Sequence, residues 1–271
     1  MDEINFSEID RLHNKLKNLR PLSPCSVKRL SEDFMIDYTY NSNAIEGSTL
    51  TLDETARVVK DGITISKKPL SHHLDAIGHR DAYYYIEDLV KNKMPFTEKS
   101  IQAIHALVLM GEGLNRGVYR GLPVRIGNFH PCQPYEVPLK MEQLIKEYNT
   151  NMQNLHIIER VALFHLKFET IHPFIDGNGR VGRLILNFDL MKEGFPPINI
   201  KYTDREIYYD CFNHYRENNE NPLKMIELVA NYATNELRRY IDMVEESERL
   251  IREQPEHFCS EYRSRDSTLL Q

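Results

Sequence analysis

The chain has 271 residues, of which 41% are hydrophobic and 27% are charged, and this composition is typical of a folded globular protein. Its formal net charge of -6 argues against a generally basic nucleic-acid binder, although a local cationic pocket is compatible with it. No apolar run approaches the roughly 20 residues of a membrane-spanning helix, so we expect no membrane insertion.

The N-terminal stretch MDEINFSEIDRLHNKLK lacks the apolar core of a secretory signal. The four cysteines are scattered and form no C-x-x-C pair, which indicates neither a zinc ribbon nor a redox motif. Both features predict a cytoplasmic protein with reduced thiols. The cysteines are Cys25, Cys132, Cys211 and Cys259.

Most of the chain shows helical periodicity. Thr97 suits the N-cap of one helix, Gly194 suits the end of another, and Pro222 suits the first turn of a third. Apolar residues recur at helical spacing in four stretches, and we expect a helix at each: residues 101–108, 157–171, 181–191 and 223–241.

One stretch, residues 117–138, departs from the helical pattern. Val124 and Ile126 alternate with polar residues before a turn that contains two prolines. The alternation resumes at Tyr135 and Val137, so we expect a short β-hairpin or flap here.

These elements predict an all-α protein, a helical bundle with a short β-hairpin flap over the active site. We expect one compact unit with an N-terminal helical region at residues 1–95 and a catalytic core at residues 96–244. Residues 245–271 are polar, which predicts a charged helix end followed by a weakly ordered tail.

The stretch HPFIDGNGRVGR, residues 172–183, contains the pattern G-x-G-x-x-G. A dinucleotide-binding turn needs a buried strand before the glycines, whereas a helical stripe precedes them here. We therefore expect a helix, a tight loop and a second helix whose free N–H groups point at an anion.

The side chains of this stretch fit chemistry on a nucleotide phosphate. Arg180 and Arg183 project from the first turn of the new helix and suit phosphate oxygens. Asp176 is a hard carboxylate of the kind that binds Mg²⁺ beside a polyphosphate. His172 ends the preceding helix and can take a proton near neutral pH.

The same twelve residues resemble the complete signature of the Fic family, His-x-Phe-x-(Asp/Glu)-Gly-Asn-Gly-Arg-x-x-Arg, with every specified position present. The resemblance extends from the N-terminal helix to the helix after Pro222 and includes the flap. It implies an all-helical fold with a β-hairpin flap. It also implies a protein adenylyltransferase that uses Mg²⁺ to transfer AMP from ATP to a protein hydroxyl.

The resemblance implies a role for each position of the motif. His172 would be the general base, and Asp176 would hold Mg²⁺ between the α- and β-phosphates. Arg180 would contact the β-phosphate side, Arg183 would reach the γ-phosphate, and Phe174 would anchor the loop in the core. The remaining nucleotide contacts would come from the motif and the flap, with the first three forming the anion hole: Gly177, Asn178, Gly179, Val181, Gly182, Val124, Arg125, Ile126 and Gly127.

A second motif, SNAIEG at residues 42–47, resembles the inhibitory signature of the family, (Ser/Thr)-x-x-x-Glu-(Gly/Asn). Ser42 and Glu46 are four apart and share a helix face, and Gly47 suits a C-terminal cap. The resemblance implies that Glu46 pairs with Arg183 and blocks productive γ-phosphate binding. Taken alone, the residues favour a solvated glutamate beside a capping glycine.

Two further features point to partners. The flap stretch VRIGN, residues 124–128, offers an open edge to which a target segment can add as a strand. The stretch PCQP, residues 131–134, replaces the adjacent prolines of many relatives and leaves target choice open. Tyr208 and Tyr209 resemble residues near the adenine pocket of the family, and plain helix packing explains them as well.

Three histidines lie close together in the chain, at His72, His73 and His79. Adjacent histidines on a helix point apart, so we expect a solvated polar face rather than a metal site.

We therefore expect a cytoplasmic protein adenylyltransferase that is held in check by Glu46. One alternative is removal of AMP from a modified protein, with Glu46 orienting the attacking water. Another is a nucleotide-sensing interaction module with weak catalysis. The target protein, the choice of Ser, Thr or Tyr as acceptor, self-modification and assembly into a homo-oligomer stay open.

Overall fold

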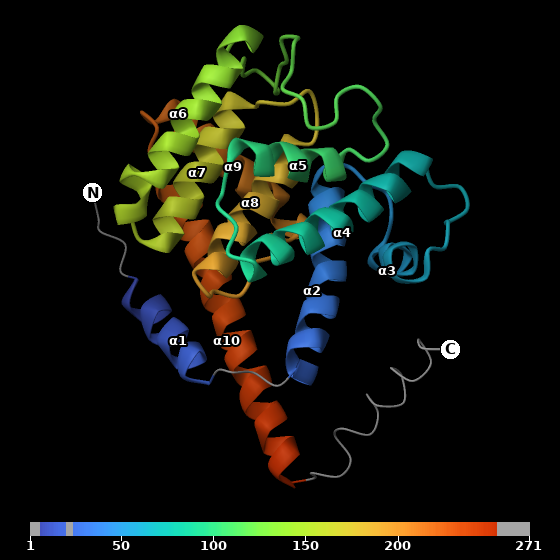
Figure 1. The fold of residues 1–271 in the computed structure, drawn as a ribbon, viewed down its shortest axis with the longest axis vertical. Coiled ribbons are helices and arrows are strands. Elements are labelled where there is room, and N and C mark those ends of the chain that lie inside the picture. Colours follow the sequence, from blue (N-terminus) through green and yellow to red (C-terminus); the bar gives the residue numbers. More distant parts are fainter. Residues whose placement is uncertain (1–5, 20–23, 254–271) are drawn as a thin grey trace.

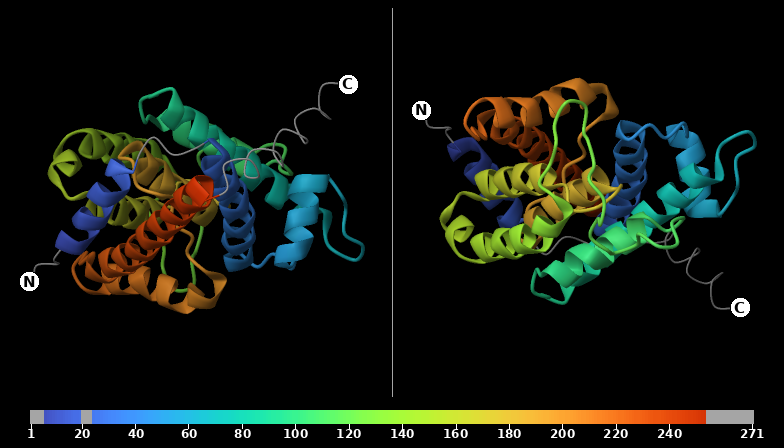
Figure 2. Two further views of the ribbon diagram at one scale, coloured as in Figure 1. Left: turned by 90° about the horizontal axis from the view of Figure 1, so that it is seen from below. Right: turned by 90° about the horizontal axis from the view of Figure 1, so that it is seen from above.

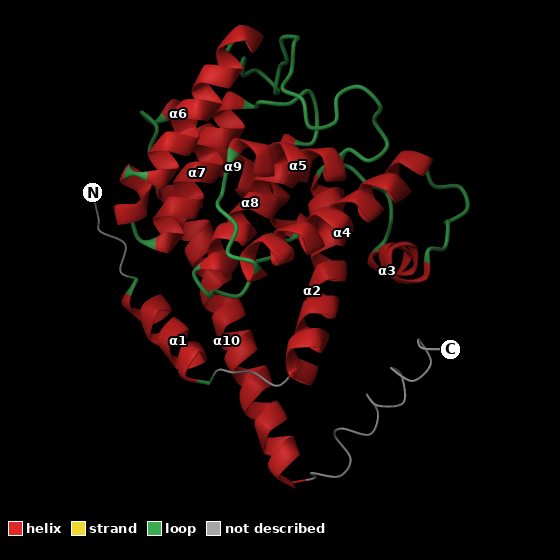
Figure 3. Cartoon of the chain, in the orientation of Figure 1, coloured by secondary structure: helices red, strands yellow, loops and turns green. Residues whose placement is uncertain are grey.

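The protein is described by a computed structural model of residues 6–19 and 24–253 (Figure 1). This part of the chain forms ten α-helices and three short 3₁₀ helices and contains no β-strand (Figure 3), so the all-α prediction is confirmed. The α-helices are α1 (Ser7–Asn18), α2 (Pro24–Ile45), α3 (Leu52–Asp61), α4 (Leu70–Lys91), α5 (Glu98–Val108), α6 (Val137–Asn149), α7 (Ile157–Ile171), α8 (Asn178–Lys192), α9 (Arg205–Glu217) and α10 (Leu223–Glu253). The 3₁₀ helices are η1 (Pro134–Glu136), η2 (Asn151–Asn154) and η3 (Tyr202–Asp204).

The predicted helix signals lie where the helices begin and end. The Thr97 side chain accepts a hydrogen bond from Ser100 N–H and caps α5. Gly194 follows α8 with a φ of +82°, and Pro222 directly precedes α10. Helix α10 continues past the predicted start of the tail at residue 245, and the rest of that tail, residues 254–271, lies outside the described residues.

Two hydrophobic clusters fill the interior of the bundle. One cluster contains side chains from each α-helix from α2 to α8. The other contains side chains of α1, α9 and α10 packed on the opposite sides of α7 and α8. Helix α8 therefore lies at the centre, and twelve of its 15 residues are buried. This arrangement places the start of α8, and with it the glycine-rich stretch, on a rigid central element.

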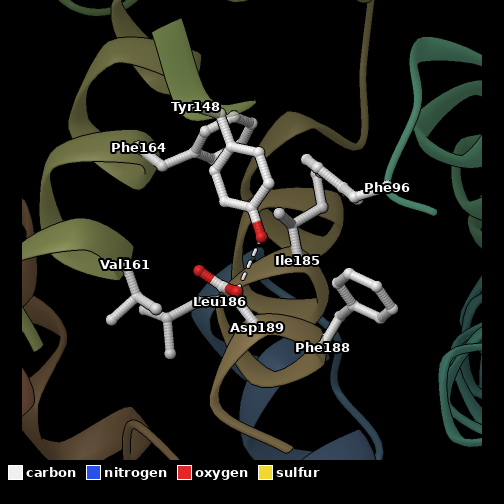
Figure 4. A pocket seen from close by; sticks show the side chains of 8 residues that line it. All are labelled: Phe96, Tyr148, Val161, Phe164, Ile185, Leu186, Phe188 and Asp189. Atoms are coloured by element: carbon white, nitrogen blue, oxygen red, sulfur yellow. Dashed lines mark hydrogen bonds between the residues drawn. The ribbon is translucent and has the colours of Figure 1, made fainter. Parts of the chain in front are cut away.

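A buried polar group helps to fix α8 against its neighbours. Arg160 of α7 pairs with Asp189 of α8 at 2.9 Å, and both side chains are at most 6% exposed. Tyr148 of α6 donates a hydrogen bond of 2.7 Å to the same carboxylate (Figure 4). The cavity beside them measures about 10 Å³, which holds at most one water molecule. The group is thus a structural link between three helices and not a ligand site.

The flap at residues 117–138 differs from the predicted β-hairpin. In the described part of the chain it is a long loop (Figure 2), with a single antiparallel bridge between Ile126 and Phe129. The strand expected at Tyr135 and Val137 is wrong, because these residues belong to η1 and α6. Pro134 and Pro138 explain the difference, since proline cannot donate to a strand ladder and favours the first turn of a helix.

The prediction of a solvated histidine face on α4 is wrong for two of the three residues. His73 is 4% exposed and accepts a hydrogen bond from Ile65 N–H, and His79 is fully buried beside Thr39. Helix α4 packs against α2, α3, α5 and α8, so most of its circumference is covered. No group of three metal-binding side chains occurs in residues 6–19 and 24–253.

No helix within the described ranges combines the length and the apolar character that crossing a bilayer requires.

Candidate active site

The glycine-rich loop is a tight connection between α7 and α8. His172 caps the end of α7 with a φ of +50°, and Gly177 caps the start of α8 with a φ of +77°. The Asn178 side chain braces the turn, because it accepts from Phe174 N–H and donates to Phe174 O, each at 2.9 Å. Phe174 is fully buried and stacks on His105 at 3.6 Å between ring centroids. The loop is therefore held from both sides, and its backbone surrounds a preformed space at the start of α8.

The first arginine of the motif lies between two carboxylates. Arg180 is 4% exposed and pairs with Asp75 of α4 at 2.5 Å and with Asp176 at 3.3 Å. The Asp176 side chain is 70% exposed, and one of its oxygens accepts from Gly177 N–H at 2.6 Å. Sequence reasoning missed Asp75, because nothing in its local pattern marks it as a partner of the motif.

The second arginine is held by residues of the SNAIEG stretch, residues 42–47. Arg183 is 2% exposed, and its Nη2 donates to Glu46 Oε1 and to Ser42 O, each at 2.8 Å. Its Nε donates to Ser42 Oγ at 3.1 Å, and its Nη1 donates to Tyr208 OH at 3.3 Å. The predicted meeting of Glu46 and Arg183 is thus present, although 137 residues separate them.

Glu46 lies directly after α2, which ends at Ile45, and Gly47 follows with a φ of +97°. A Cβ atom on Gly179 would overlap the Glu46 carboxylate, so this carboxylate rests against the backbone of the loop. A negative group therefore occupies the place beside the α8 N-terminus where an anion is most favoured.

A cavity of about 730 Å³ opens next to this carboxylate, and its size suits a drug-sized or nucleotide-sized ligand. The flap tip, the end of α7, the start of α8 and one face of α9 enclose it. Its lining residues are Glu46, Ile126, Gly127, Asn128, Phe129, Glu169, His172, Gly179, Arg183, Tyr208, Tyr209, Phe212, Asn213, Arg216 and Glu217.

Not every residue that the sequence assigned to the nucleotide lines this cavity. Ile126 and Gly127 line it, whereas Val124 and Arg125 are not among its lining residues. Val181 is fully buried in the hydrophobic core. A Cβ atom on Gly182 would lie 2.5 Å from the His165 ring, so Gly182 permits the close approach of α7 and α8.

His172 is fixed through its backbone by the base of the flap. Arg120 is 4% exposed and donates to His172 O at 2.7 Å and to Cys132 O at 2.6 Å. Arg120 N–H also donates to Pro173 O at 2.9 Å. One buried arginine therefore ties both ends of the flap to the loop, and sequence reasoning missed it because the residue lies outside both motifs.

Comparison with known proteins shows which family has this arrangement. Residues 95–190 match the model of the Fic/DOC family. The protein named Protein adenylyltransferase Fic from Nematostella vectensis is 32% identical over 248 residues, which cover 89% of this chain and 56% of that protein. Residues 95–190 are a Fic/DOC domain. The protein of the same name from Drosophila grimshawi is 29% identical, over 92% of this chain and 53% of its own length.

Solved structures of Fic proteins agree with the fold. A Fic domain containing signaling protein from Bacteroides thetaiotaomicron has a TM-score of 0.82 at 28% identity, covering 88% of this chain and 98% of that chain. Fic-1 from C. elegans has a TM-score of 0.79 at 26% identity, covering 89% and 72%. The chain spans about half the length of the curated relatives that it matches.

In this Fic protein the two tyrosines of α9 have different surroundings. Tyr208 is 1% exposed, and its hydroxyl lies 2.7 Å from His165 Nε2 as well as against Arg183. Burial raises the pKa of Tyr208 well above its usual value. Tyr209 is only partly buried and lies under the Arg205 guanidinium, 5.0 Å from the ring centroid. Both tyrosines line the cavity, and Tyr208 also supports the second arginine.

Two buried histidines of the Fic site are held in the neutral form. His105 Nε2 lies 3.0 Å from Asp176 O, while its Nδ1 accepts from Gly117 N–H at 2.9 Å. Burial lowers the pKa of His105 to about 4, against the opposing effect of the Asp176 carbonyl. Burial, together with the charge of Arg183, lowers the pKa of His165 to about 3.

These pKa values predict that the protein loses stability in mild acid. Below pH 6.5 these histidines take up protons in the unfolded chain and stay neutral in the folded protein. The free energy of unfolding is therefore highest above pH 6.5 and decreases toward pH 4. The expected loss is about 2 kcal/mol per histidine between pH 6.5 and 4.5. Urea unfolding at the two pH values measures it, and the same measurement on His165→Gln should show a shallower pH dependence. Equal dependence in both proteins would contradict this assignment.

Proposed function

We propose that this Fic protein transfers AMP from ATP to a hydroxyl side chain of a protein, and that Glu46 holds the activity in check. One observation carries the proposal: the Glu46 carboxylate binds Arg183 inside a cavity that His172 also lines. A buried arginine with a removable carboxylate partner is suited to bind the phosphates of a nucleotide. The relatives named Protein adenylyltransferase Fic support the same activity.

The residues of the chain divide the work between binding and proton transfer. We propose that Arg183, once released, binds the γ-phosphate, and that the backbone of residues 177–179 binds the neighbouring phosphates. His172 accepts the proton of the target hydroxyl while the oxygen attacks the α-phosphorus and pyrophosphate leaves. His172 and Arg183 line the same cavity, so the base and the phosphate-binding group are held in fixed positions, which lowers the cost of alignment.

Asp176 fits the demands of Mg²⁺. It is an exposed carboxylate at the edge of the loop, and Mg²⁺ typically takes one or two carboxylates together with phosphate oxygens and waters. Such an ion would supply positive charge to the departing pyrophosphate.

The replacement Asp176→Asn should therefore weaken nucleotide binding in a Mg²⁺-dependent manner, because the amide carries no charge. The measurement is a titration of nucleotide binding against Mg²⁺ concentration, with Asp210→Asn as a control that removes an exposed carboxylate from α9. Superimposable Mg²⁺ curves for wild type and Asp176→Asn would show that another group holds the metal.

The flap is the proposed docking site for the target. A single bridge, Ile126 to Phe129, accounts for the strand pairing found in the described part of the flap. The backbone around it is therefore available for a target segment to add as a strand.

Removal of AMP from a modified protein is a second proposal, and one observation favours it. Glu46 Oε1 binds Arg183, while a third of the side chain remains exposed at the cavity. A carboxylate in this place can orient a water molecule. An AMP-modified target is incubated with wild type and with Glu46→Gln. Loss of AMP removal in Glu46→Gln supports the hydrolytic role, because only that role requires the carboxylate.

The test of the main proposal uses α-labelled ATP in a lysate of the source cell together with Glu46→Gly. We expect label on a small number of protein bands, which mass spectrometry then identifies. A purely nucleotide-sensing module would bind the ATP and leave every band unlabelled.

A further inference from the structure

Among the buried polar atoms of the site that lack a hydrogen-bond partner within the described residues, two belong to neighbouring side chains. They are Nδ1 of His172 and Oε1 of Glu169. The other Glu169 oxygen, Oε2, lies 3.3 Å from His172 Nδ1, at an angle outside that of a regular hydrogen bond. The two side chains are only 11% and 18% exposed. A buried carboxylate without a donor is costly, so this juxtaposition requires an explanation.

The geometry of α7 explains why these two groups meet. Glu169 precedes His172 by three positions and therefore lies on the same helix face. The backbone of His172 cannot move freely, because Arg120 holds its carbonyl oxygen and Phe168 O accepts its N–H. A rotation of the imidazole ring by a small angle is enough to turn the 3.3 Å contact into a hydrogen bond.

Two other groups near Glu169 are less well placed than His172. Within the described residues Nδ1 of His165 also lacks a partner, but the ion pair that Glu169 forms, at 3.3 Å, is with His172. Arg216 of α9 lines the same cavity, but it donates to Asn213 at 2.7 Å and lies 4.6 Å from the centroid of the Phe129 ring. His165 is neutral and binds Tyr208 through Nε2. The imidazole of His172 is thus the donor best placed for Glu169.

We propose that Glu169 is a positioning residue that keeps a proton on Nδ1 of His172. The free base atom is then Nε2 of His172, a residue that lines the cavity. This inference rests on the proposed function and extends it to a residue outside both motifs.

The proton balance follows from this arrangement. The target O–H proton moves to Nε2 of His172 as the new oxygen–phosphorus bond forms and the bond to the pyrophosphate breaks. The imidazolium then carries protons on both nitrogens, and the Glu169 carboxylate stabilises it through Nδ1–H. A neutral imidazole in water favours the proton on Nε2, and in that tautomer Nε2 cannot accept the proton of the target hydroxyl. The Glu169 carboxylate stabilises the other tautomer by accepting from Nδ1–H.

The tautomer of His172 tests the proposal without any activity measurement. Long-range ¹H–¹⁵N spectra of protein labelled in its histidine rings, with His172 assigned from His172→Asn, report which nitrogen carries the proton. We expect the Nδ1–H form in wild type and the Nε2–H form in Glu169→Ala. Glu147→Gln is the control, because it removes a carboxylate that faces α7 through Lys167, away from the cavity.

The kinetic arm uses AMP transfer in a Glu46→Gly background. Adding Glu169→Ala should lower kcat on the order of 10²-fold and leave KM for ATP nearly unchanged, and Glu169→Asp should restore part of kcat. If Glu169→Ala is unstable, Glu169→Met fills a similar volume without an oxygen acceptor and serves in both arms. An Nε2–H form in wild type, or an unchanged tautomer in both Glu169 variants, would overturn the proposal. If no AMP is transferred by any protein, the proposed function fails while the tautomer still decides the role of Glu169.

Discussion

Replacing Glu46 with glycine is expected to raise the rate of AMP transfer, including self-modification, at least tenfold. Arg183 cannot bind a γ-phosphate while Glu46 and Ser42 occupy its donors at 2.8–3.1 Å. Losing one charge-assisted contact is worth about 1.5–3 kcal/mol, which corresponds to a factor of about ten or more. The carboxylate also rests against Gly179, so its removal opens the space beside the loop for a phosphate.

The measurement is the initial rate of labelled AMP incorporation at saturating ATP. The isosteric variant Glu46→Gln should fall between wild type and Glu46→Gly, because it keeps the volume and loses the charge. The double variant Glu46→Gly with Arg183→Ala should lose most of the gain, since the freed arginine is absent. A Glu46→Gly protein no faster than wild type would show that the ion pair only stabilises the fold.

Removing the His172 side chain is expected to abolish transfer and to leave ATP binding largely intact. In the proposed mechanism Arg183 and the backbone at Gly179 hold phosphate, and His172 supplies only a proton acceptor. Loss of a general base typically costs about 10²–10⁴-fold in rate.

The structure decides which substitution to use. His172 has a φ of +50°, where alanine is strained and asparagine is tolerated, so His172→Asn separates lost chemistry from a distorted loop. His72→Asn, on α4, is the matched control. Isothermal titration with ATP and the rate of AMP incorporation are compared for the three proteins. A His172→Asn protein that transfers AMP at the rate of wild type would refute the assignment.

The sequence predicted the helices and the glycine-rich loop because their signals are local. Thr97 and Gly194 mark helix ends through their own backbone and side-chain chemistry, and Phe174 follows from its place in the motif. The pairing of Glu46 with Arg183 is predicted only by the family resemblance. The two residues are 137 positions apart in the sequence, so no local pattern predicts their contact.

The remaining features depend on tertiary packing. Asp75 and Arg120 reach the site from positions that no motif marks, and only the folded chain brings them there. The strand expected at Tyr135 and Val137 failed because alternation over a few residues is weaker than the helix-starting effect of two prolines. His79 is buried because α4 is covered by several helices, which its own sequence does not show.

The most direct test of AMP transfer and of its restraint by Glu46 follows two labels of ATP at once. Purified Glu46→Gly protein is incubated with Mg²⁺ and with ATP that carries one isotope on the α-phosphate and another on the γ-phosphate. We expect the α-label to become bound to protein, the γ-label to appear in pyrophosphate, and the wild-type protein to gain far less α-label. Protein-bound γ-label, or equal α-label on the two proteins, would contradict the proposal.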